Sequence, residues 1–166
     1  MKKRTLIVAA ILAATTIGVN AQTNLCLGEG VEATASSVRT VGDQINEAID
    51  GNDGTRWQPN AEFDKEDKET ADMVGSEDHF WYKVDFKEPK DFNLVRILWE
   101  NSYIKGFQIL VSNDNENWTK VYEQKDQAVE GKKYASYNIG DQNARYIKVW
   151  ATDLRIPHIS VSMSYR

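Results

Sequence analysis

The chain has 166 residues, a formal net charge of −5 and a mean hydropathy of −0.56. Nucleic acids and anionic lipid surfaces are bound through lysine and arginine, so this acidic balance argues against both as ligands. The length suffices for one domain with a substantial apolar core, and we expect no separate catalytic domain.

The N-terminus has the features of a bacterial secretory signal. Three basic residues precede an apolar run from Leu6 to Ala14, and Ala21 offers a small side chain at the cleavage point. The apolar run is shorter than the roughly 20 residues of a membrane-spanning helix. We therefore expect residues 1–21 to be removed and residues 22–166 to form a single domain that is secreted, periplasmic or displayed at the cell surface. Removal of three positive charges would change the net charge from −5 to −8.

The segment from Ala48 to Trp57, AIDGNDGTRW, concentrates oxygen-bearing side chains and two glycines in one short run. Asp, Asn and Thr supply the oxygen ligands that hard cations prefer. Gly51 and Gly54 allow the backbone to fold back, so that carbonyl groups can point at the same centre. A plain tight turn uses the same residue types, and composition alone leaves both interpretations open.

An acidic insertion follows this loop. From Glu62 to Asp78 the sequence has eight acidic residues against two lysines, with almost no apolar periodicity. Such a segment favours a solvated loop, because it cannot bury enough apolar surface to order itself. The alternative is that it forms one wall of a binding site close to Trp57.

Further along the chain the dominant period is two, which predicts strands with one face in the core. The alternating segments are Tyr82–Phe86, Val95–Trp99, Phe107–Val111, Tyr146–Trp150 and Ile159–Met163. Turn residues separate them at the short spacing that is typical of an antiparallel sandwich or barrel. No long helical pattern is present.

Three segments in this order resemble one known family. They are AIDGNDGTRW from Ala48, WYKVDF from Trp81, and WENSYIKGFQILVSNDNENW from Trp99. The resemblance is to the discoidin family, also called the coagulation factor V/VIII type C domain family, and it is close to bacterial carbohydrate-binding module family 32. It extends from about Leu27 to the C-terminus. It implies an all-β fold, an eight-stranded antiparallel jelly-roll β-sandwich, with which the alternation agrees independently.

The resemblance also implies a structural calcium ion in the glycine-containing loop. The positions that match the family's ligands are Glu47, Asp50, Asn52 and Thr55. The last strand of the family normally adds a glutamate, and here Ser160 stands in its place. Loss of that charge favours a weaker calcium site, a sodium ion, or a loop held by hydrogen bonds alone.

Two residues that bind sugar in galactose-binding relatives are replaced by other residue types in this sequence. Gln58 and Glu100 stand where those relatives have a histidine and an arginine, while Trp99, Glu100 and Tyr103 match a branch with diverse ligands. Loops at one end of a sandwich should converge, which predicts a carbohydrate site made of Gln58, Glu100, Tyr103, Arg155 and His158. Structural alternatives remain for several of them: Glu100 as an ion-pair partner, Tyr103 as packing, and His158 as an ordinary surface histidine.

The tryptophans are expected to be mainly structural. Trp81, Trp99, Trp118 and Trp150 lie in or beside apolar strand patterns, so we assign them to the core or its edge. Trp57 is expected to pack under the glycine-containing loop.

Together these features predict a secreted, non-catalytic carbohydrate-binding module, monomeric, with a glycan or glycoconjugate as its partner. A glycosidase would need two carboxylates held roughly 5–9.5 Å apart, and nothing in the acidic insertion fixes such a pair. A protein-binding or adhesive domain that docks on a partner at the bacterial cell surface stays open. Lipid binding is disfavoured, because Ser37-Val38-Arg39 offers one valine and no aromatic residue.

Overall fold

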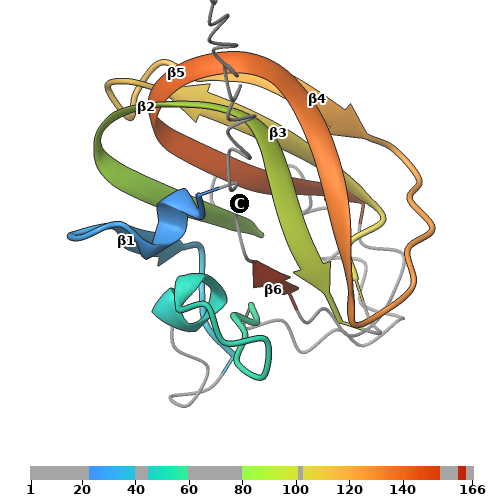
Figure 1. Ribbon diagram of the computed structural model, residues 1–166. Helices are drawn as coiled ribbons and strands as arrows, with labels where there is room; N and C mark the ends of the chain where they lie inside the picture. Colours follow the sequence, from blue (N-terminus) through green and yellow to red (C-terminus); the bar gives the residue numbers. More distant parts are fainter. Residues whose placement is uncertain (1–22, 40–44, 60–79, 101–102, 154–160, 164–166) are drawn as a thin grey trace, which may run out of the picture.

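The structure is a computed structural model that describes residues 23–39, 45–59, 80–100, 103–153 and 161–163. Its strands, all paired antiparallel, are shown in Figure 1: β1 (Glu32–Ala35), β2 (Trp81–Trp99), β3 (Gly106–Ser112), β4 (Thr119–Gln124), β5 (Lys133–Asp153) and β6 (Val161–Met163). Two short 3-10 helices, η1 (Leu25–Leu27) and η2 (Ile45–Ile49), complete the described elements. Within these residues no helix is long and apolar enough to cross a membrane.

Two long strands, β2 and β5, pair with each other in both layers of the fold, and Figure 1 shows them bending together. Their pairing shifts register between Asp85 and Lys90 and again between Phe92 and Leu94, and such bulges bend a strand pair. The start of β2 and the end of β5 lie between β1 on one side and β3 and β4 on the other.

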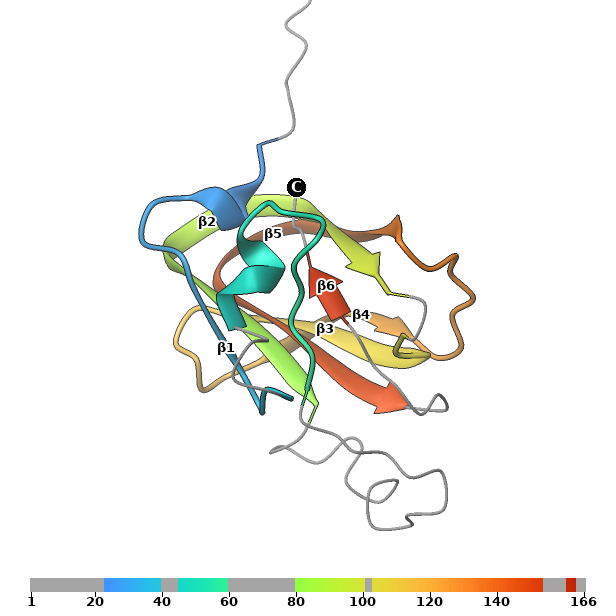
Figure 2. The same cartoon turned by 90° about the horizontal axis from the view of Figure 1, so that it is seen from below.

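The other half of β2, from Leu94 to Trp99, pairs with the start of β5 and with β6, which Figure 2 shows from below. The described residues therefore contain six continuous strands instead of the expected eight, because β2 and β5 each serve both layers. The mostly antiparallel β architecture agrees with the predicted β-sandwich.

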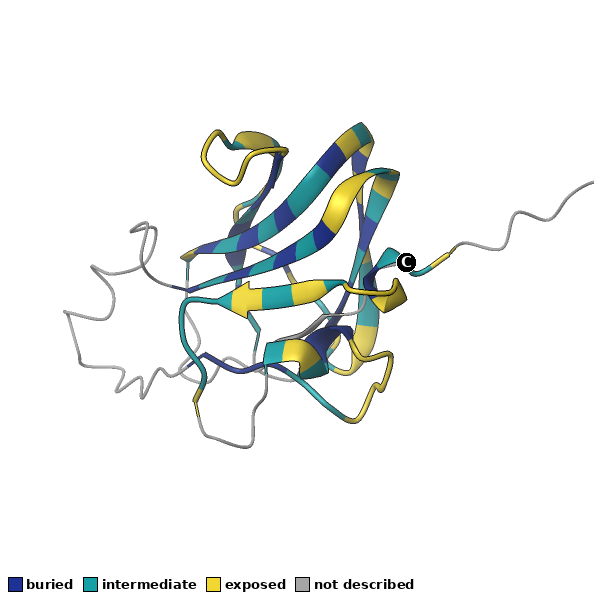
Figure 3. Ribbon diagram, turned by 90° about the vertical axis from the view of Figure 1, so that its left-hand side faces the viewer, coloured by how far each residue is buried: buried dark blue, intermediate teal, exposed yellow. Residues whose placement is uncertain are grey.

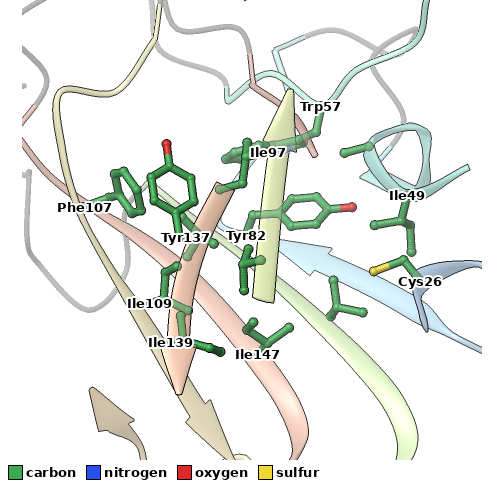
Figure 4. Packing of buried hydrophobic residues seen from close by; sticks show 14 of the residues in the cluster. Cys26, Ile49, Trp57, Tyr82, Ile97, Phe107, Ile109, Tyr137, Ile139 and Ile147 are labelled. Carbon is green, nitrogen blue, oxygen red and sulfur yellow. The ribbon is translucent and has the colours of Figure 1, made fainter. Parts of the chain in front are cut away.

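The core lies between these layers. Buried and more exposed residues alternate along the strands, as the bands in Figure 3 show. Figure 4 shows Phe107, Tyr137, Ile97 and Tyr82 directed into one apolar cluster. The rings of Phe107 and Tyr137 meet edge to face, with centroids 5.1 Å apart.

A buried chain of hydrogen bonds crosses this core. Trp99 Nε1 donates to the hydroxyl of Tyr137 at 2.7 Å, and that hydroxyl donates to Oε1 of Gln127 at 2.7 Å. The Gln127 side chain in turn donates to the carbonyl of Ile104. Burial raises the pKa of Tyr137, so the phenol stays neutral and acts as a donor. These hydrogen bonds tie the β4–β5 connection to Ile104, in the β2–β3 connection.

The tryptophans divide between two environments. Trp99 is fully buried, as expected for a core residue, and Trp57 is 1% exposed and packs on Tyr82 with ring centroids 5.1 Å apart. The remaining three are only half-buried and lie outside the core cluster: Trp81, Trp118 and Trp150. The expectation of core or core-edge packing is thus confirmed in full only for Trp99.

Candidate functional site

The glycine-containing loop is fixed to the core at both ends. It begins after η2, whose Ala48 and Ile49 are buried, and ends at Trp57. The Trp57 indole donates to the carbonyl of Ser37 at 2.8 Å, which fixes the buried ring at the end of the loop, while its packing beneath the loop stays a prediction. Gly51 adopts a φ of +80°, and an added Cβ would lie 3.2 Å from Leu27 Cδ2. Both the turn and this close approach require glycine.

Within the loop the predicted ligand residues are close together around the Thr55 hydroxyl. The hydroxyl oxygen lies 2.7 Å from the Asn52 carbonyl oxygen and 3.3 Å from the Glu47 carbonyl oxygen. It also lies 2.8 and 3.0 Å from the two carboxylate oxygens of Asp50. A hydroxyl carries one proton and can donate fully to only one of these four oxygens. Carboxylate, carbonyl and hydroxyl oxygens are the donors that suit a hard cation such as calcium.

This oxygen set contains a single carboxylate. Among the described residues no group of three or more His, Cys, Asp or Glu side chains could hold a metal ion. The fifth predicted ligand, Ser160, lies outside the described residues. Glu47, Asp50, Asn52 and Thr55 are therefore brought together by the structure, while the cation itself stays a prediction.

Gln58 is buried, with 5% of its surface exposed, and it holds Arg39 in place. Its side-chain Oε1 accepts a hydrogen bond from the Arg39 guanidinium at 3.1 Å, and its carbonyl accepts one from the Arg39 backbone N–H at 2.8 Å. Arg39 itself is exposed. Arg39 is thus the side chain that this pair presents to solvent, a role that its place in the sequence did not predict.

Glu100 follows directly after β2 and lies 3.8 Å from Arg56, which directly precedes Trp57. The Glu100 side chain is 22% exposed, and the pair is at the long end of ion-pair distances. Arg56 Nε is buried without a hydrogen-bond partner among the described residues. The pair joins the C-terminal end of the glycine-containing loop to the β2–β3 connection.

Tyr103, in the same connection, is half-buried and packs against the core. Its hydroxyl accepts a hydrogen bond from the backbone N–H of Val129 at 3.3 Å. The ring thus links the β2–β3 and β4–β5 connections, which agrees with the packing alternative. Arg155 and His158 lie outside the described residues, as does the acidic insertion from Glu62 to Asp78.

Residues 32–164 of the chain match the family described as F5/8 type C domain. Chitosan-binding module 1 of a chitosanase/glucanase from Paenibacillus sp. IK-5 is 27% identical, with a TM-score of 0.67 over 87% of this chain and 100% of that module. Chitosan-binding module 2 of the same enzyme, in complex with chitotriose, is 24% identical over 86% of this chain and 100% of that one, with a TM-score of 0.64. No curated protein matches the sequence.

A further solved structure supports the fold alone. It is CpGH89CBM32-5 from Clostridium perfringens, in complex with GalNAc-β-1,3-galactose. The two are 18% identical over 82% of this chain and 95% of that one, with a TM-score of 0.61.

Proposed function

Because the chain belongs to the F5/8 type C domain family, we propose that it is a secreted, non-catalytic carbohydrate-binding module. The observation that supports this most strongly is the likeness to a chitosan-binding module over that module's whole length, at 27% identity. Secretion rests on the sequence of residues 1–21, and the expected location is periplasmic, extracellular or at the cell surface. We expect the module to act as a monomer with a glycan or glycoconjugate as its partner.

We place the Arg56–Glu100 pair at the end of the fold that binds the carbohydrate, which we call the ligand end. Glu100 is partly exposed, and its long 3.8 Å contact with Arg56 leaves carboxylate lone pairs for a ligand. A carboxylate accepts hydrogen bonds from sugar hydroxyls and pairs with the ammonium of an amino sugar such as glucosamine. Glu100 is therefore the residue that we expect to contact the saccharide.

Two of the other predicted residues have polar groups that are already bonded within the protein. Gln58 orients Arg39, so Arg39 is the group that a ligand would meet. Tyr103 has its hydroxyl bonded to Val129, so its contribution would come from the exposed part of its ring. Arg155 and His158 stay candidates from the sequence alone.

The cation in this proposal is structural. Glu47, Asp50, Asn52 and Thr55 would hold a calcium ion, or a sodium ion, and the ion would brace the loop that leads to Arg56. It would take no part in chemistry, because the module performs none. Its role is to fix the segment from Asp50 to Trp57 in the conformation that supports the ligand end.

Titration with chitotriose and a panel of neutral glycans, followed by NMR, tests the proposal. We expect a dissociation constant on the order of 0.1–1 mM, because a shallow site makes few buried contacts. Glu100→Gln should weaken binding, whereas the matched variant Glu130→Gln, in an exposed pair with Lys133, should not. Absence of binding to every glycan, or release of reducing sugar, would contradict the proposal.

A further inference from the structure

Arg56 and Glu100 are each attached directly to a buried tryptophan. Trp57 follows Arg56, is 1% exposed and belongs to the core cluster that Figure 4 shows. Trp99 precedes Glu100 and is fully buried. Each indole N–H donates a hydrogen bond inside the fold, at 2.8 Å for Trp57 and at 2.7 Å for Trp99. The core therefore fixes the two backbone positions from which the side chains of this pair extend.

The two side chains face each other across a gap that is too wide for a direct hydrogen bond. Arg56 Nη1 lies 3.8 Å from Glu100 Oε1, whereas N–H···O hydrogen bonds are about 2.7–3.2 Å long. Two hydrogen bonds of about 2.8 Å that meet at one oxygen at roughly a right angle span about 4 Å. The gap therefore matches a single oxygen that accepts a hydrogen bond from Arg56 and donates one to Glu100.

Both groups have hydrogen-bonding capacity that the protein does not use. Among the described residues the one polar contact of the Arg56 side chain is with Glu100, and Arg56 Nε is buried without a partner. The Arg56 side chain is nevertheless 40% exposed, and that of Glu100 is 22% exposed. Because Nε is covered, the donors that a ligand meets are the Nη groups. A ligand can thus reach a donor and an acceptor side by side.

The pair is selective because its two members have opposite hydrogen-bonding roles. A guanidinium only donates, and an ionised carboxylate only accepts. A sugar hydroxyl does both, so it can bond to Arg56 and Glu100 together. An ammonium only donates. In the gap it would bond to Glu100, leave Arg56 without an acceptor and place two positive charges beside each other.

Arg56 also changes the preference that Glu100 would have on its own. An isolated carboxylate attracts the ammonium of glucosamine, as does the whole chain with its net charge of −5. The positive charge of an arginine is permanent, and at 3.8 Å it offsets the negative charge of Glu100. A cationic sugar therefore gains little at this pair, whereas a neutral hydroxyl keeps both of its hydrogen bonds.

We propose that Arg56 is a specificity-determining residue, and that the pair holds a hydroxyl of a neutral saccharide and disfavours a free amino sugar. The inference rests on the proposed carbohydrate binding at Glu100 and adds the class of saccharide. The chain is 27% identical to a chitosan-binding module, and chitosan is a β-1,4-linked polymer of glucosamine. We expect this chain to prefer the corresponding neutral β-1,4-linked glucan.

Titration of the whole mature chain with two matched trisaccharides tests this inference. Chitotriose and cellotriose share a β-1,4-linked backbone, and the second carbon of each ring carries an ammonium in chitotriose and a hydroxyl in cellotriose. NMR gives both dissociation constants at a mildly acidic pH that keeps the amines charged. An ionic strength of about 0.15 M screens the long-range attraction of the acidic chain. We expect cellotriose to bind roughly fivefold more tightly, the upper range for one exposed charge pair.

Arg56→Gln should abolish the preference for cellotriose. It removes the positive charge but keeps an amide that can donate to a hydroxyl. The ratio of the chitotriose to the cellotriose dissociation constant should fall roughly fivefold, because Glu100 then attracts the ammonium without opposition. Arg56→Lys, which keeps the charge, should retain the wild-type preference. The matched variant Lys120→Gln, in the ion pair with Glu123 on β4, should leave the ratio unchanged.

Three results would overturn this inference. They are equal or tighter binding of chitotriose by the wild type, an unchanged ratio in Arg56→Gln, and no binding of either probe. The first two leave the proposed function intact, because the protein still binds a saccharide. After the third, the wider panel of neutral glycans decides the proposed function separately.

Discussion

The hydroxyl of Thr55 lies within hydrogen-bonding distance of both carboxylate oxygens of Asp50, at 2.8 and 3.0 Å. It is also 2.7 Å from the carbonyl oxygen of Asn52. One hydroxyl proton can be donated fully to only one of these acceptors, so the remaining contacts between oxygen atoms are repulsive. A bound cation would remove that repulsion and stabilise the loop.

Calcium should therefore raise the melting temperature of the protein, and a chelator should lower it. An ion present at about one hundred times its dissociation constant stabilises the folded state by about 2.7 kcal/mol. Asp50→Ala should abolish the calcium-dependent shift. Asp53→Asn, in the same loop but bonded to Tyr134 instead of Thr55, should retain it. Differential scanning fluorimetry with and without calcium measures this shift for the wild type and both variants. Identical melting curves of the wild type with and without calcium would contradict the proposed ion.

Gly51→Ala should destabilise the protein more than Gly30→Ala. Both glycines have positive φ, +80° and +75°, so both substitutions carry a backbone cost of about 1–2 kcal/mol. At Gly51 the added Cβ also meets Leu27 at 3.2 Å, whereas at Gly30 the nearest atom is 3.9 Å away. Urea unfolding gives the two free energies. An equal loss of unfolding free energy in the two variants would show that Leu27 moves away from the added Cβ without a cost in stability.

Asp85 should make stability depend on acid pH. Hydrogen bonds from Arg145 are the main cause that lowers the pKa of Asp85 to about 2 in the folded protein, from an unfolded value of 3.8. Its stabilising effect is thus complete above about pH 4 and is lost as the pH falls towards 2. Because Arg145 is partly exposed, we expect a contribution of about 1 kcal/mol.

Asp85→Asn should accordingly lower the free energy of unfolding at pH 7 but not at pH 2, as measured by urea titration across this range. A constant difference between wild type and Asp85→Asn at all pH values would rule out the ionic contribution.

Tyr137→Phe should cost more stability than Tyr122→Phe. Removal of the Tyr137 hydroxyl leaves the buried Trp99 N–H and the Gln127 amide oxygen without their partner, at a cost of about 1–3 kcal/mol. The Tyr122 hydroxyl donates to Gln124 on the half-buried strand β4, where water can replace it. Chemical denaturation of the two variants compares these costs; a larger loss for Tyr122→Phe would contradict the importance of the buried chain.

The fold could be predicted from the sequence because burial on one face imposes a period of two. The alternation at Tyr82–Phe86 and Phe107–Val111 appears in the structure as strands whose apolar members are buried. β1 and β4 were not predicted, because their residues are mostly exposed or half-buried and show no strong apolar alternation. The continuity of β2 and β5 through both layers depends on bulges, which short patterns do not reveal.

The candidate site was predictable in part. The oxygen ligands of the glycine-containing loop are local in sequence, so Glu47 to Thr55 could be identified together. The Arg39–Gln58 and Arg56–Glu100 contacts join distant segments, and residue types alone do not determine such pairings. Trp81 could have been placed outward from the sequence, since it alternates with the buried Tyr82.

NMR mapping of a saccharide titration tests the central claim of carbohydrate binding most directly. Chitotriose is the first probe, because the chain is 27% identical to a chitosan-binding module. We expect saturable shifts for residues near Glu100 and Arg56, with no cleavage of the probe, and loss of most of these shifts in Glu100→Gln. Shifts confined to the predicted cation ligands between Glu47 and Thr55, or no shifts with chitotriose and the wider glycan panel, would contradict the account.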